Sequence, residues 1–223
     1  MLKSWTKLEK VLLFGSILLI SIVGIICKSD ILTTLCAIVG VVTVLLLAKG
    51  KNLGQIFGVL IAILYSIVSF KNRYYGEVMI YLIIMLPMHI IGIFSWFRHK
   101  NEKTDSVEVN KISKKEWIIV ALLFSGIFVG IYYLLKAFNT NELIVSTISV
   151  LASLFACYLQ IRRSRFSFGF YMINDIILMV LWGIPVVKGS IVLLPILLDP
   201  TINFINDSYG FYNWRKMEKE QKE

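Results

Sequence analysis

The stretch YMINDIILMVLW (171–182) places an amide beside a carboxylate inside an otherwise apolar segment. On a helix, Tyr171, Asn174, Asp175 and Trp182 fall on one face, within an arc of roughly 100°. A carboxylate at the centre of a membrane-spanning helix costs about 2.5–3.5 kcal/mol on insertion scales, so it is expected to face the interior of a bundle or a wet cavity. Aromatic rings beside it could stack on a flat ring or hold a cation. The stretch therefore predicts a binding site for a small polar solute.

A second polar stripe lies near the end of the sequence, where Asp199, Asn203 and Asn206 follow one another at i, i+4 and i+7, with Asp207 beside them. Neither Asp175 nor Asp199 has a Lys or Arg in its own apolar segment as a partner. Two unpaired acids around one cavity suit a cationic solute. Polar faces of two earlier segments supply further candidate binding residues, namely Tyr65 and His89.

Purely structural explanations stay open for these residues. Asn174 and Asn203 could form hydrogen bonds that hold helices together. Asp175 could be protonated and bonded to a neighbouring amide, and Asp199 precedes a proline and could lie at a helix break. His89 could be packed and hydrogen-bonded without binding a solute.

The composition indicates a polytopic membrane protein. Of the 223 residues, 57% are hydrophobic and only 17% are charged, with a mean hydropathy of +0.77. Each long apolar stretch approaches the ~20 residues that a helix needs to cross a bilayer. None alternates apolar and polar residues as a barrel strand would. We therefore expect an all-α membrane protein with about eight transmembrane helices, at roughly 11–27, 31–48, 53–70, 77–97, 117–136, 142–161, 168–187 and 191–212.

The basic residues indicate the orientation. If the N-terminus is inside, the cytoplasmic segments carry 18 of the 23 Lys and Arg residues. This asymmetry follows the positive-inside rule and predicts a multi-pass protein of the inner or plasma membrane with both termini in the cytoplasm. The net charge of +9 is thus explained by topology, and we expect no nucleic-acid partner.

The chain also shows a weak internal repeat. The segment GIFSWFRHK (92–100) resembles GFYNWRKM (210–217), with Gly and Trp at matched positions and basic residues following. Chance similarity between apolar segments is the alternative. A true repeat predicts two four-helix units, 1–100 and 112–217, joined by the polar linker 101–110. Both units would point the same way, and such repeats usually hold a substrate site at their interface.

The cysteines and two of the tryptophans are explained without catalysis or metal binding. Cys27, Cys36 and Cys157 are odd in number and have no metal-ligand or disulfide spacing. Trp96 and Trp214 precede basic residues, as in an interfacial aromatic belt. We find no nucleophile with a positioned base, and so expect no enzyme activity, no cofactor and no metal.

The chain resembles the PnuC family of nicotinamide riboside transporters. The resemblance rests on a Tyr-Gly-acid turn and a following Pro-Met, on an Asn eight residues before a Trp, and on a closing Asn-x-x-Tyr-Gly-x-x-x-Trp. These motifs occur in YYGEVMIYLIIMLPMHIIGIFSWFRHK (74–100), NDIILMVLW (174–182) and NDSYGFYNWRKM (206–217).

The resemblance implies a SWEET-like fold of two parallel three-helix repeats joined by a linker helix, with an extra helix in front. The expected divisions are an extra N-terminal helix at 1–30, a first repeat at 31–100, a polar linker with its connecting helix at 101–137, a second repeat at 138–217 and a charged tail at 218–223.

The resemblance further implies a homotrimer in the lipid bilayer that imports a vitamin precursor by facilitated diffusion, followed by phosphorylation in the cytoplasm by a separate kinase. Asn174, Trp182 and Asn206 match the substrate-contacting positions of the family. His89 replaces a usual Gln, and Asp207 replaces a Ser.

Ile61 also stands where an Asn is frequent, and Asp175 and Asp199 have no counterpart in the family pattern. The resulting hypothesis is a uniporter for nicotinamide riboside. Thiamine or (deoxy)nucleosides are the alternative substrates, and a channel or a non-transporting assembly protein is the rival role.

Overall fold

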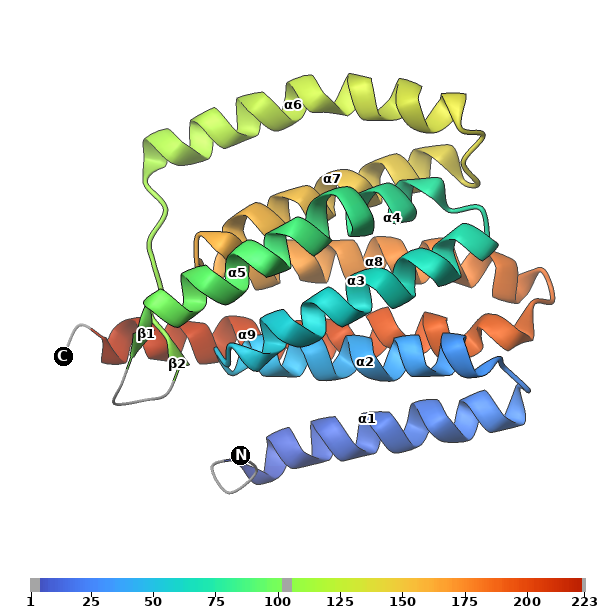
Figure 1. Ribbon diagram of the computed structural model, residues 1–223, viewed down its shortest axis with the longest axis horizontal. Helices are drawn as coiled ribbons and strands as arrows, with labels where there is room; N and C mark the ends of the chain where they lie inside the picture. Colours follow the sequence, from blue (N-terminus) through green and yellow to red (C-terminus); the bar gives the residue numbers. More distant parts are fainter. Residues whose placement is uncertain (1–4, 102–105, 222–223) are drawn as a thin grey trace.

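The computed structural model describes residues 5–101 and 106–221. Long helices run side by side along the longest axis of the molecule (Figure 1). In chain order the elements are α1 (Lys7–Ile26), α2 (Ile31–Ala48), α3 (Leu53–Lys71), α4 (Tyr75–Met79), the π-helical η2 (Ile80–Met85), α5 (Leu86–Arg98), β1 (Lys100–Asn101), β2 (Ser106–Val107), α6 (Lys114–Ala137), α7 (Leu143–Ile161), α8 (Phe166–Val187), the 3₁₀ turn η3 (Ile191–Leu193) and α9 (Leu194–Glu220).

The predicted fold class is confirmed. Within the described residues, seven helical segments are long and apolar enough to span a membrane, with α4, η2 and α5 forming one continuous span. The eighth long helix, α9, carries more polar residues and packs against α2 and α8. The two-repeat division remains a prediction. Residues 1–4, 102–105 and 222–223 of the predicted N-terminal, linker and tail segments lie outside the described residues.

Side chains at the helix ends explain where several helices begin. Thr6 and Glu9 form a capping box at the start of α1, so this helix begins four residues before the predicted span. The Asp30 carboxylate accepts from the Thr33 amide at the start of α2, and Ser113 caps α6 in the same way. Each cap satisfies a backbone N–H that the first turn leaves unpaired.

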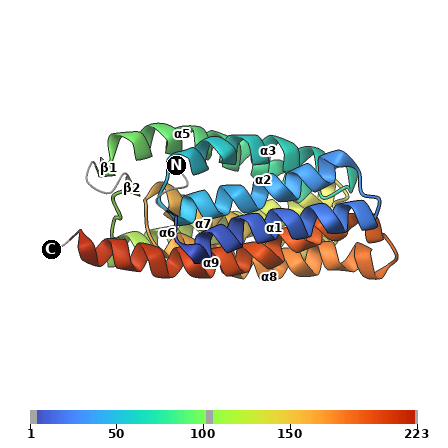
Figure 2. The same ribbon diagram turned by 90° about the horizontal axis from the view of Figure 1, so that it is seen from below.

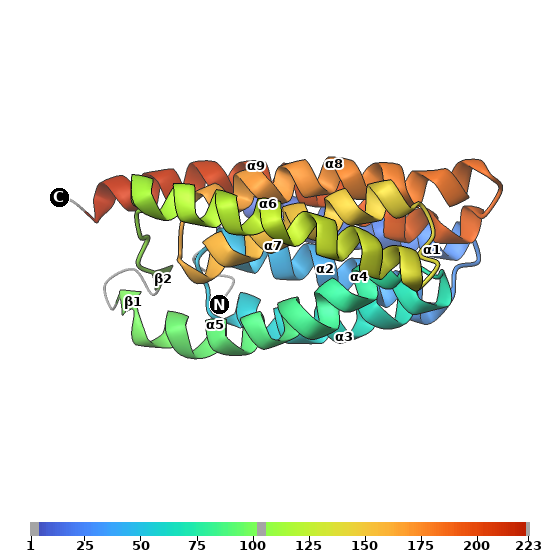
Figure 3. The same cartoon turned by 90° about the horizontal axis from the view of Figure 1, so that it is seen from above.

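Six helical segments form a closed ring. Neighbouring contacts run from α2 to α3, then to the α4–α5 segment, α7, α8 and α9, and α9 returns to α2. Two further helices lie outside the ring, with α1 against α2 and α9, and α6 against α7 (Figures 1 and 3). The interior of this ring is the place where polar side chains can avoid lipid.

The α4–α5 segment is irregular at its centre. Its helix widens to a π-helical stretch at Ile80–Met85, directly before Pro87. Proline has no N–H to donate to the preceding turn, so the regular hydrogen-bond ladder is interrupted there. Such π-helical stretches are frequent at functional sites, and this one brings Tyr81 and Met85 to the ring interior.

Two aromatic layers lie inside the bundle. The first layer, near the end where α2 begins, consists of Tyr65, Tyr74 and Trp182. The second layer, near the end where α2 stops, consists of Trp96, Phe168 and Trp214.

The placement of Trp96 and Trp214 in an interfacial belt is therefore wrong. Both indoles are buried, at 1% and 0% exposure, because they pack on each other with ring centroids 5.5 Å apart. The Trp214 indole N–H also donates to the Leu47 carbonyl at 3.1 Å, which fixes this ring between α2 and α9.

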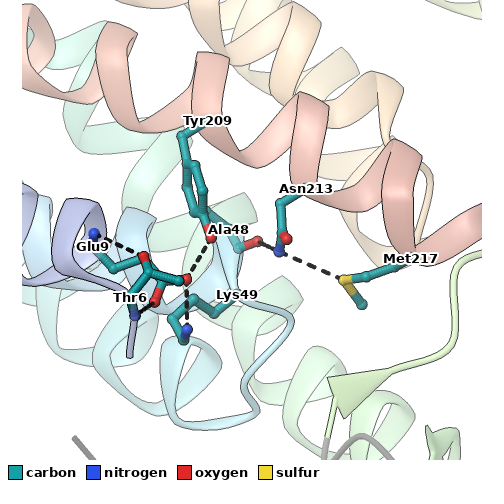
Figure 4. A network of polar contacts seen from close by, with 7 residues as sticks. All are labelled: Thr6, Glu9, Ala48, Lys49, Tyr209, Asn213 and Met217. Atoms are coloured by element: carbon teal, nitrogen blue, oxygen red, sulfur yellow. Dashed lines mark hydrogen bonds and ion pairs between the residues drawn. The ribbon is translucent and has the colours of Figure 1, made fainter. Parts of the chain in front are cut away.

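The start of α1 is tied to the ring by a buried polar cluster (Figure 4). The Glu9 carboxylate pairs with Lys49 at 2.6 Å, accepts from the Thr6 amide at 2.7 Å and also accepts from the Tyr209 hydroxyl. We call Thr6, Glu9, Lys49 and Tyr209 the Glu9 cluster. It joins α1 to the last residues of α2 and to α9, at the end of the bundle where α1 begins and where β1 and β2 lie (Figure 2).

Candidate functional site

A cavity of about 70 Å³ lies in the middle of the ring, a volume large enough for several water molecules. Its walls come from α2, α3, η2, α5, α8 and α9. Apolar side chains such as Ile61, Met85 and Leu178 alternate with polar ones. The polar lining residues are Thr43, Tyr81, His89, Tyr171, Asn174, Asp175, Asp199, Asn203 and Asp207.

Most of the predicted binding residues meet at this cavity. Six of the nine line it, namely Tyr171, Asn174 and Asp175 from α8, Asp199 and Asn203 from α9, and His89 from α5. Trp182, Tyr65 and Asn206 are buried but do not line it. The lipid cost of these polar side chains is thus avoided by burial around a shared hollow.

Asn174 is held from behind by a hydrogen-bond chain. The Ser149 hydroxyl of α7 lies 3.1 Å from the Asn174 carbonyl oxygen and 2.7 Å from Glu77 of α4. With its oxygen facing Ser149, Asn174 keeps its NH₂ group as a donor for a solute. Glu77 is fully buried, and its Oε2 has no partner among the described residues.

His89 combines a structural role with a place in the cavity wall. Its Nδ1 lies 2.8 Å from Gln55 Oε1, and because an amide oxygen only accepts, Nδ1 is the donor in this arrangement. Its Nε2 then remains to bond a solute. The imidazole of His89 lies against Gly58 of α3, where a Cβ atom would overlap it.

The carboxyl groups gather on one side of the cavity. Asp199 accepts from the Asn203 amide at 3.0 Å, and it lies against Gly40 of α2, where a Cβ atom would meet its carboxyl group. Asp175 of α8 and Asp207 of α9 both line the cavity, and these two helices pack on each other. Carboxyl groups gathered in a desolvated site favour a proton on at least one of them, since ionised carboxylates only accept hydrogen bonds and repel one another.

Trp182 and Tyr65 lie one layer behind the wall. The Trp182 indole N–H donates to the Tyr65 hydroxyl at 2.5 Å, and the Tyr65 ring stacks on Tyr81 with centroids 4.3 Å apart. Tyr81 is the member of this group that lines the cavity. In this structure Trp182 therefore supports the wall through Tyr65 and Tyr81.

Asn206 has neither side-chain atom paired among the described residues, although it is fully buried. It lies on α9 one turn beyond Asn203 and beside Asp207, two residues that do line the cavity. An unpaired buried amide is costly. A solute that extends along α9 would satisfy it.

Four polar or aromatic wall residues were not among the predicted binding residues. Phe168 and Thr43 sit among apolar neighbours, so their types carried no signal, and Tyr81 lies on the helix face that carries His89 at its edge. Asp207 was noted as a neighbour of the α9 stripe and as a replacement for a Ser of the family pattern. Its acidic type inside a predicted span was the signal that could have added it to the binding residues.

Comparison with known proteins identifies relatives of this chain. Residues 30–216 match the sequence profile of a family described as nicotinamide mononucleotide transporter. A protein of Neisseria mucosa named nicotinamide riboside transporter PnuC is 26% identical over 223 residues, which cover 96% of this chain and 83% of that protein. A protein of the same name from Haemophilus influenzae is 26% identical over 194 residues, covering 84% of this chain and 80% of that protein.

A solved structure shares the fold. The crystal structure described as that of the vitamin B3 transporter PnuC superposes with a TM-score of 0.87 at 25% identity, covering 97% of this chain and 94% of the other. The helix α1 precedes the region matched by the family profile, whereas every residue that lines the cavity falls within it.

Proposed function

The chain belongs to the family of nicotinamide mononucleotide transporters, and from this premise we propose that it carries nicotinamide riboside, or a closely related vitamin precursor, across the inner or plasma membrane. The observation that carries the proposal is the cavity with polar lining residues inside a ring of apolar helices. Buried polar side chains that converge on a hollow within a membrane are typical of a solute pathway.

The charge of the cavity favours the riboside over the mononucleotide. Three carboxyl groups line it, and within the described part of the chain no Lys or Arg does. A phosphate group would meet like charge here and find no cation to pair with, which is costly in a low-dielectric site. A pyridinium ring, in contrast, would find carboxyl groups and the Tyr81 and Tyr171 rings.

Thiamine is the second candidate because its thiazolium ring is also a flat cation. The chain departs from the family pattern at His89, Ile61, Asp207, Asp175 and Asp199, and all five positions line the cavity. Substitutions concentrated on the wall change what the wall recognises. An uncharged deoxynucleoside gains less from the carboxyl groups than either cation does.

The mechanism we propose is alternating access. Asn174, Asn203 and Asn206 would bond the ribose hydroxyls or the carboxamide, and the two aromatic layers would open one at a time as the repeats rock against each other. Transport would be passive, with a cytoplasmic kinase trapping the product, and the transporter itself would perform no catalysis. We further propose that both termini are cytoplasmic and that the chain forms a homotrimer in the bilayer.

Uptake into proteoliposomes that contain only this protein tests the proposal. We expect saturable uptake of labelled nicotinamide riboside, weaker uptake of a deoxynucleoside, and none of the mononucleotide. Asn174→Ala should reduce the uptake of the riboside. Asn110→Ala provides the control, since it removes an amide from the loop between β2 and α6.

Two outcomes would reject this function. The first is no uptake of any of the compounds by well-folded protein in sealed vesicles. The second is faster uptake of the mononucleotide than of the riboside, which would show that the carboxyl-lined cavity is not where the solute binds. If the protein preferred thiamine over the riboside, the proposed transport mechanism would stand and the proposed substrate would be thiamine.

A further inference from the structure

The cavity has more acidic groups than a passive binding site for one cation requires. Asp175, Asp199 and Asp207 all line it and are buried, at 6%, 6% and 2% exposure. Asp175 Oδ2 and Asp207 Oδ1 have no hydrogen-bond partner among the described residues, and neither has the Asn203 carbonyl oxygen. These unpaired acceptors all belong to side chains of the cavity wall.

Three ionised carboxylates cannot share this small space. Two like charges about 4 Å apart repel by about 4 kcal/mol even at an effective dielectric constant of 20. Within the described residues, no Lys or Arg lines the cavity to neutralise these carboxyl groups. The empty cavity therefore stores at least one proton on its carboxyl groups.

We infer that a cationic solute displaces this proton when it docks, so that the Asp175–Asp207 pair exchanges a proton for the cation. The O–H bond of one carboxyl group breaks, the proton passes to water, and the carboxylate left behind faces the cation. The charge of the cavity is the same before and after binding. This avoids the cost of adding an unpaired charge to a desolvated site. The inference rests on the proposed function and adds the release of a proton to its binding step.

No other titratable group near Asp175 and Asp207 is a better acceptor for the displaced proton among the described residues. His89 is the base in the wall, but an imidazolium there would place a second cation beside the solute, and its Nδ1 is already bonded to Gln55. The other titratable groups on the packed elements are Cys36 (α2), Tyr65 (α3), Glu77 (α4), Tyr81 (η2), Cys157 (α7), Tyr171 (α8) and Asp199 (α9). Thiol and phenol groups are weaker acids than a carboxyl group. Of the two further carboxyl groups, Glu77 accepts from Ser149 and Asp199 accepts from Asn203.

Calorimetric titration of the purified protein tests the exchange. Nicotinamide riboside is titrated in buffers with different ionisation enthalpies, and the slope of the binding enthalpy against buffer enthalpy counts the protons released. We expect close to one proton per bound cation, and an affinity that rises about tenfold per pH unit while the pair is protonated in the empty site. The dihydro form, which has nearly the same shape without the charge, should release none.

Paired variants assign the proton to its site. Asp175→Asn/Asp207→Asn should bind the cation more weakly and without proton release, while its affinity for the dihydro form should fall by a smaller factor. Glu142→Gln, which removes a carboxyl from the turn before α7, should behave like the parent. Binding of the dihydro form also shows that the variant is folded.

The inference is overturned if the parent protein binds the cation with no dependence on buffer, or if it releases as many protons on binding the dihydro form. If neither ligand binds at all, the proposed function itself has failed. Failure of the transport proposal and failure of the proton exchange therefore give different results.

Discussion

Asn174 is the clearest example of a side chain whose environment assigns its role. It is 4% exposed and lines the cavity, and Ser149 bonds its carbonyl oxygen from the neighbouring helix. In the proposed site the amide is held in one orientation, so its donor group would be positioned before the solute arrives. A binding site arranged in advance loses less entropy on binding.

Asn174→Ala should therefore weaken the binding of nicotinamide riboside by about 1–3 kcal/mol, since a buried hydrogen bond is lost and Ser149 is left without one acceptor. Binding affinity of the purified variant measures this. Asn110→Ala, in the loop between β2 and α6, serves as the control that changes an amide away from the cavity. Equal affinity in the variant and the parent would remove Asn174 from the site.

Trp182 and Tyr65 should act as one unit, because their hydrogen bond connects them behind the wall. Trp182→Phe and Tyr65→Phe each remove this bond while keeping most of the ring packing. We expect the double variant to bind nicotinamide riboside as weakly as the single variants, because coupled residues are not additive. A double-mutant cycle on binding affinity measures the coupling.

Additive effects would contradict this account of Trp182. They would show that the indole contacts the solute directly, as the family resemblance implies, and that Tyr65 acts separately from it.

At the scale of the helices, the apolar pattern predicted most of the fold. The range 31–48 matches α2, and 53–70 falls one residue short of α3. The ends that differ have local causes. The capping box at Thr6 starts α1 early, and the final helix continues to Glu220, because polar residues can continue a helix beyond the apolar span.

The candidate site was predicted only in part. Residues on one helical face point toward the same side of the helix, but the pattern does not indicate how far along the helix axis the cavity lies. Trp182 shares the face of Asn174 but lies eight residues further along, which is about 12 Å at 1.5 Å per residue. It therefore reaches the first aromatic layer and not the cavity. The contacts of His89 with Gln55 and of Asn174 with Ser149 join different helices, and no pattern within one segment reveals them.

The helix α1 should depend on the Glu9 cluster for its attachment (Figure 4). Both partners of the ion pair are shielded, with side-chain exposures of 3% for Glu9 and 10% for Lys49. Removing one partner of a buried pair typically costs about 3–5 kcal/mol. Glu9→Gln should therefore lower the thermal unfolding temperature in detergent by several degrees.

Glu220→Gln is the matched control, since it changes an exposed carboxyl at the end of α9 that lies outside the Glu9 cluster. Because α1 does not line the cavity, Glu9→Gln should leave the affinity for nicotinamide riboside close to that of the parent. An unchanged unfolding temperature would show that the cluster does not hold α1 in place.

The described part of the molecule is a ring of helices around a cavity with polar lining residues. One aromatic layer packs near each end of the cavity, and two helices, α1 and α6, lie outside the ring (Figures 1 and 3). In the proposed mechanism these layers separate a bound solute from the two surfaces of the membrane. This arrangement fits a transporter that opens to one side at a time and not a continuous channel.

The most direct test of the central claim is an experimental structure of the protein with nicotinamide riboside bound. The account predicts density for the solute inside the ring, with its pyridinium beside Asp175 and Asp207 and its polar groups bonded to Asn174. Density outside the ring, or in a site that none of these three residues touches, would contradict it.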